Sequence, residues 1–91
     1  MSAIDKLRFD EKLRENPRIK NSRISVIQVY EMNVLNGETV EEIAEKYEAL
    51  DREAVRQAIR YARLHPDEIR QQATSELTKQ IVERQSRSAA A

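Results

Sequence analysis

The chain has 91 residues, a length that allows a single domain. Charged residues make up 35% of it and hydrophobic residues 40%, with 3 Tyr, 1 Phe and no Trp, so the core must be small and aliphatic. The lack of cysteine excludes disulfides and thiolate metal sites, and one histidine cannot build a histidine-rich site, so we expect no metal and no cofactor. The longest uncharged run, 24–30, is far shorter than the roughly 20 apolar residues that span a bilayer. We expect a cytoplasmic protein without a membrane segment.

The net charge is zero, but the charges are unevenly distributed. Residues 1–26 carry seven basic and four acidic groups (+3), residues 27–55 two and eight (−6), and residues 56–91 seven and four (+3). A charged partner would therefore meet an oriented surface.

The chain divides into three segments: 1–23, 24–65 and 66–91. The first has no helical period, and the turn signals Asn16-Pro17 and Asn21-Ser22 separate short apolar stretches. We predict extended pieces near 7–9 and 17–20, which could pair as a hairpin.

The middle segment predicts three helices. The first begins at Ser25 and ends at Asn36-Gly37, because glycine favours a left-handed helix stop. The second, over 39–47, begins with a capping box between Thr39 and Glu42. The third, over 52–64, follows Asp51 as N-cap, with Leu50 and Val55 placed to form a hydrophobic staple. The core expected from these helices comprises Val26, Val29, Tyr30, Ile43, Tyr47, Val55 and Ile59.

The last segment predicts a fourth helix that begins at Pro66, since proline suits a first helical turn. Its apolar residues recur every fourth position, as Ile69, Ala73, Leu77 and Ile81. We interpret this thin stripe as a partner-binding face; the alternative is that it folds onto the domain. The tail after Arg84 is expected to be disordered or frayed.

The second and third helices have the outline of a helix-turn-helix, in which the second helix of the pair lies in the major groove. On a helical wheel, Arg52, Arg56, Arg60 and Arg63 share one flank of that helix. Guanidinium groups bind phosphates or guanine, and the amide of Gln57 could read adenine. The predicted DNA-binding residues are Arg52, Arg56, Gln57, Arg60 and Arg63, together with Arg23. The alternative is an ordinary solvated surface on which the arginines pair with Glu41, Glu45, Glu48 or Glu53.

The sequence predicts no enzyme. Its single glycine, Gly37, is accounted for as a helix stop, which leaves no glycine-rich phosphate loop. His65 precedes Pro66 at a helix break, where a capping or surface role is expected, and no cysteine or fixed serine–acid pair accompanies it.

Several stretches together resemble a small prokaryotic family, the domain-of-unknown-function family four hundred and thirty-three. They are 17–26 (PRIKNSRISV), Gly37, 41–44 (EEIA), 55–62 (VRQAIRYA) and 65–69 (HPDEI). Asn21 and Ser22 stand where the family usually has Gly-Thr; asparagine tolerates a left-handed turn and serine keeps a hydroxyl. The resemblance covers about residues 17–69.

The resemblance implies a mainly α, homeodomain-like three-helix helix-turn-helix core with a short N-terminal β element, followed here by the C-terminal helix. It also implies that members of the family look like antitoxins of VapB type, encoded beside PIN-like ribonuclease toxins. We therefore expect an antitoxin that binds its own promoter and neutralises such a toxin. The alternative is a protein-interaction module, or a helix-turn-helix regulator without a toxin partner.

We also expect a homodimer or higher oligomer. The core is small, operators of helix-turn-helix proteins are usually palindromic, and an N-terminal β segment without a strand partner in its own chain would leave an edge to pair.

Overall fold

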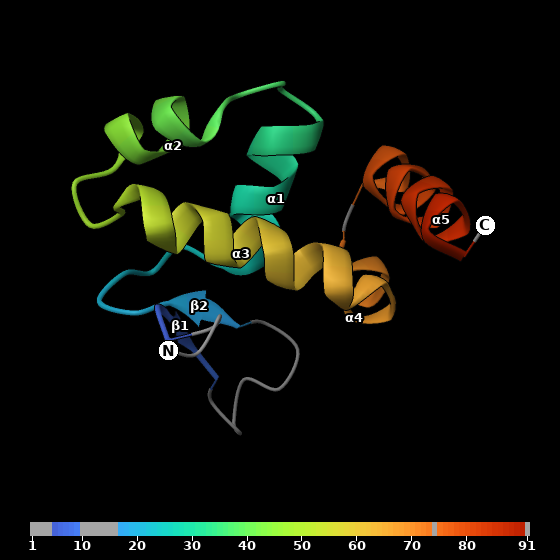
Figure 1. Cartoon of the computed structure of the whole chain (residues 1–91), viewed down its shortest axis with the longest axis horizontal. Helices are drawn as coiled ribbons and strands as arrows, with labels where there is room; N and C mark the ends of the chain where they lie inside the picture. The colour runs from blue at the N-terminus through green and yellow to red at the C-terminus, as the bar shows by residue number, and fades with distance from the viewer. Residues whose placement is uncertain (1–4, 10–16, 74, 91) are drawn as a thin grey trace.

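The structure is a computed structural model that describes residues 5–9, 17–73 and 75–90. The protein is mainly helical, with a two-stranded antiparallel sheet near the N-terminus (Figure 1), which confirms the predicted fold class. The elements in chain order are β1 (Leu7–Arg8), β2 (Arg18–Ile19), α1 (Val26–Val34), α2 (Val40–Lys46), α3 (Arg52–Leu64), α4 (Pro66–Gln72) and α5 (Glu76–Ala90).

The two strands form the hairpin that the sequence suggested. Leu7 pairs with Ile19, and both side chains are buried. The chain then reverses at Asn21, whose φ of 63° lies in the left-handed region that asparagine tolerates. Because β1 and β2 pair with each other, the expectation of an N-terminal strand without a partner in its own chain is wrong.

Local capping signals set the starts of the first three helices. Ser25 and Gln28 form a capping box at α1, and Thr39 and Glu42 form the predicted one at α2. The carboxylate of Asp51 accepts a hydrogen bond from the backbone N–H of Ala54 at 2.7 Å, which caps α3 as predicted. Each pair satisfies amides that would otherwise lack partners in the first turn.

The turn between α1 and α2 contains Gly37, whose φ is +68°. That value confirms the left-handed stop expected there, since a side chain at this φ would be strained. The predicted boundaries of α3 agree with the structure at both ends.

Helix α3 is central, because it contacts α1, α2, α4, α5 and the hairpin (Figure 1). Leu50 and Val55, the predicted staple residues, are both buried. Of the seven predicted core residues, all but Tyr47 are buried, and Tyr47 packs against the core while partly exposed. The aliphatic core is therefore largely the predicted one.

The prediction of one fourth helix from Pro66 to Arg84 is wrong. Helix α4 ends at Gln72, Ala73 is extended, and α5 begins at Glu76. The break changes the phase of the helix, so Thr78 and Val82 face inward. Helix α5 packs against α1, α3 and α4, and the tail expected to be disordered or frayed is helical to Ala90.

Within residues 5–9, 17–73 and 75–90, no helix combines the length and the apolar character that a membrane span requires.

Candidate nucleic-acid interface

Helices α2 and α3 form a helix-turn-helix outline at one end of the core (Figure 1). The turn over 47–51 is closed by a hydrogen bond from the backbone N–H of Leu50 to the carbonyl of Tyr47, at 3.1 Å. The two helices pack on each other and on α1, which leaves one side of α3 facing solvent.

The solvent-facing side of α3 carries the four predicted arginines. Because a helix turns by about 100° per residue, these positions fall within an arc of roughly 80°. All four are exposed, and we call them the arginine face: Arg52, Arg56, Arg60 and Arg63. Together they place four positive charges on one flank of the helix.

Three of the four arginines of the arginine face form no ion pair among the described residues, so their charges can meet a ligand. The only ion pair of the arginine face among the described residues joins Arg56 Nη1 to Glu53 Oε2 at 3.8 Å, with both side chains more than half exposed. Such exposed pairs are worth about 0–1 kcal/mol. The glutamates of α2 and of the following turn, which the alternative interpretation invoked, form no ion pair with α3 within the described part of the chain.

Gln57 does not belong to this interface, so its predicted role in reading adenine is wrong. The residue is only 6% exposed. Its Oε1 accepts a hydrogen bond from the backbone N–H of Lys6 at 2.7 Å, and its Nε2 donates one to Asp5 at 2.6 Å. The amide therefore fastens the N-terminal hairpin to α3. One signal in the sequence pointed this way: Gln57 shares a helix side with Ala54 and Tyr61, both buried.

Arg23, the sixth predicted DNA-binding residue, is exposed. It lines a shallow, open hollow of about 610 Å³ between the loop after β2 and the end of α2. The lining residues are Asn21, Ser22, Arg23, Ile24, Lys46, Tyr47, Glu48 and Ala49. None of these lining residues belongs to α3, and Arg23 lies beside the end of α2.

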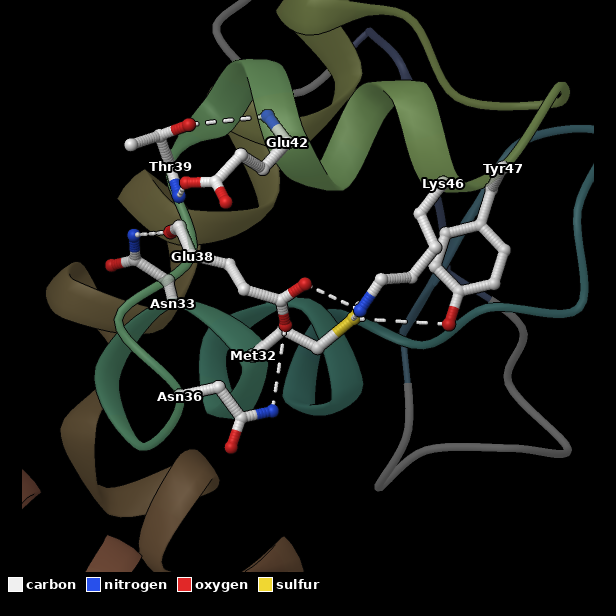
Figure 2. Close-up of polar contacts among 8 residues, drawn as sticks. All are labelled: Met32, Asn33, Asn36, Glu38, Thr39, Glu42, Lys46 and Tyr47. Carbon is white, nitrogen blue, oxygen red and sulfur yellow. Dashed lines mark hydrogen bonds and ion pairs between the residues drawn. The ribbon is translucent and has the colours of Figure 1, made fainter.

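An acidic residue in the turn before α2 pairs with the positive charge of Lys46 (Figure 2). Glu38 forms an ion pair with Lys46 and accepts a hydrogen bond from Asn36. The hydrogen bond from Lys46 is the main cause that lowers the pKa of the Glu38 carboxyl. Met32 lies beside the same group, with its sulfur 3.8 Å from the hydroxyl of Tyr47. The exposed charges left on α2 are those of Glu41, Glu42 and Glu45, which would repel a phosphate backbone.

The N-terminus of α3 is also occupied by an acid. The backbone N–H of Ala54 lowers the pKa of Asp51, and Lys6 contributes from 3.5 Å. A phosphate would have to displace this cap, so the basic character of α3 comes from its side chains rather than from its helix end.

Most of the predicted partner-binding stripe lies in the core. Ile69 is fully buried and Ala73 is 6% exposed, Ile81 is partly buried, and only Leu77, at 54%, is freely exposed. The interpretation of these four residues as one docking face is therefore wrong, because it assumed an unbroken helix through residues 73–75.

The junction of α3 and α4 accounts for the residues around His65. The imidazole ring of His65 stacks on the ring of Tyr61, with 4.1 Å between the ring centroids. The Tyr61 hydroxyl donates a hydrogen bond to Glu68. The backbone N–H of His65 bonds to the Tyr61 carbonyl and ends α3. These contacts are structural. Within the described residues, no three acidic or histidine side chains gather as metal ligands would.

Comparison with known proteins identifies one family. The family model described as "Protein of unknown function (DUF433)" matches residues 10–62, which include β2, α1, α2 and most of α3. No curated protein and no solved structure matches the chain.

Proposed function

The chain belongs to the DUF433 family of proteins of unknown function, and from the geometry of its helices we propose that it binds double-stranded DNA through the arginine face of α3. One observation carries this proposal: four exposed arginines share one flank of the second helix of a helix-turn-helix. In that motif the second helix enters the major groove. The acidic residues of α2 would then face away from the DNA.

Binding to its own promoter, as an antitoxin that also neutralises a PIN-like ribonuclease, is the fuller role that the family resemblance supports. Such a protein would act in the cytoplasm. Ile69 and Ala73 are buried, so the toxin would have to contact other residues. Of the four predicted partner-binding residues, Leu77 is the most exposed. The competing proposal is an interaction module in which the arginine face binds a protein.

Salt dependence of duplex binding tests the proposal. If the arginine face neutralises phosphates, log affinity falls linearly with log salt, by about 0.9 for each phosphate contacted. Arg60→Ala should weaken binding to all sequences and reduce that slope by about one. The matched control is Glu45→Ala on the exposed side of α2, which should not weaken binding.

The competing proposal makes the opposite prediction. An interaction module would show no measurable affinity for any duplex at about 50 mM salt, where phosphate contacts are least screened. In that case the arginine face is not a DNA-binding surface.

A further inference from the structure

The exposed side of α3 presents a restricted set of side chains. Six of its residues are exposed: Arg52, Glu53, Arg56, Arg60, Arg63 and Leu64. None of them carries an amide or a hydroxyl. The only amide of the helix belongs to Gln57, which is buried and uses both its oxygen and its nitrogen in hydrogen bonds to the N-terminal hairpin.

This set limits which bases the helix can read. In the major groove, arginine pairs with N7 and O6 of guanine, and glutamate accepts a hydrogen bond from N4 of cytosine. Adenine is read by asparagine or glutamine, and the thymine methyl group by apolar side chains. Leu64 is the one exposed apolar residue, but it is the last residue of α3, whereas recognition helices contact bases through their N-terminal residues.

Resting on the proposed function, we infer that the DNA read by α3 is rich in G·C pairs, with guanine recognised by Arg56 through N7 and O6. Arg52 and Glu53 lie beside Arg56 in the N-terminal half of the helix. Glu53, 3.8 Å from the Arg56 guanidinium, stands where it can orient that group or accept from the paired cytosine. The arginines nearer the C-terminus, Arg60 and Arg63, serve the phosphates.

Three duplexes of about 20 base pairs, or roughly two helical turns, test this inference at about 50 mM salt. One alternates dG and dC, the second alternates dA and dT, and the third is the first with every guanine replaced by 7-deazaguanine, which lacks the N7 acceptor. We expect the first to bind about ten- to a hundredfold more tightly than the other two, because each bidentate arginine contact is worth that discrimination.

Two variants assign the preference to a residue. Arg56→Gln should shift the ratio of the dA-dT to the dG-dC affinity toward adenine by about tenfold, since a glutamine at this position can pair with adenine. Arg63→Ala, at the other end of the helix, should lower both affinities and leave their ratio unchanged. Both side chains are exposed, so neither substitution should change the thermal stability. Thermal unfolding of each variant checks that the fold is kept.

The outcomes separate the two proposals. Equal, salt-dependent binding to all three duplexes would overturn guanine recognition and leave DNA binding in place. An unchanged ratio for Arg56→Gln would overturn the assignment to Arg56. Failure of every duplex to bind would overturn the proposed function and the inference with it.

Discussion

The hydroxyl of Thr78 donates a hydrogen bond to the carboxylate of Glu31 at 2.7 Å and joins α5 to α1 across 47 residues of chain. Thr78 is fully buried, and Glu31 is partly exposed. A second bond, from the hydroxyl of Tyr30 to Gln85 at 2.7 Å, joins the same two helices. The C-terminal helix is thus held to the core by specific polar contacts as well as by Val82.

Thr78→Val should lower the free energy of unfolding by about 1.5–3 kcal/mol. The change keeps the shape of the side chain but removes the donor to Glu31, and a hydrogen bond to a charged group contributes about that much. Urea unfolding measures the effect. The control is Gln80→Ala, an exposed polar residue of the same helix whose loss should change stability by less than about 0.5 kcal/mol. Equal stability of Thr78→Val and the parent would show that the bond does not hold α5.

Ending the chain after Leu64 should abolish cooperative unfolding, because it removes the buried side chains of Ile69, Ala73, Thr78 and Val82. Ile69→Ala in the full chain should cost about 2–5 kcal/mol, as does truncating other buried isoleucines. Ile81→Ala, at a partly buried position, should cost less. A shortened chain that unfolds cooperatively like the parent would contradict this.

Gln57→Ala should destabilise the protein by about 1–3 kcal/mol without changing the salt slope of DNA binding. The substitution leaves the backbone N–H of Lys6 without its acceptor and frees the hairpin from α3. Arg60→Ala should do the reverse and lower DNA affinity with little effect on stability. A loss of DNA affinity in Gln57→Ala at unchanged stability would restore Gln57 to the interface.

Stability should fall as the pH rises above about 10. Burial, followed by the hydrogen bond to Glu68 and its charge, raises the pKa of the Tyr61 phenol well above the usual value of about 10. The unfolded chain therefore loses this proton first, and ionisation favours the unfolded state in that range. Tyr61→Phe should make the decline with pH shallower in unfolding measured between about pH 8 and pH 11. The remaining decline is expected in part from Tyr30, whose pKa burial also raises.

A dimer remains the expected state in solution. The pairing of β1 with β2 removes one reason for it, but the two-fold symmetry of operators and the exposed Leu64 and Leu77 support it. Sedimentation at micromolar concentration should give about twice the 10.6 kDa of one chain. A mass of one chain at every concentration would contradict the prediction.

The sequence predicted those parts of the fold that local chemistry determines. The cap at Thr39, the stop at Gly37 and the start of α3 after Asp51 each depend on residues within four positions of one another. The exposure of the arginine face followed from helical periodicity alone.

What the sequence did not predict depends on residues far apart in the chain. The groups that bury Gln57 lie more than 50 residues before it, so no local pattern announced them. The break between α4 and α5 carries no proline or glycine at residues 73–75, and without such a signal the stripe from Ile69 to Ile81 suggested one helix.

The packing of α5 on α1 also bears on how the protein folds as it is made. The ribosome releases α1, α2 and α3 first, but Ile69, Thr78 and Val82 are still to come at that stage. Until they emerge, the sides of α1 and α3 that pack against α4 and α5 stay exposed to water, and a domain generally folds as a unit. Folding of this chain should therefore finish only after residue 82 has left the ribosome, and the proposed DNA-binding surface should mature together with the last helix.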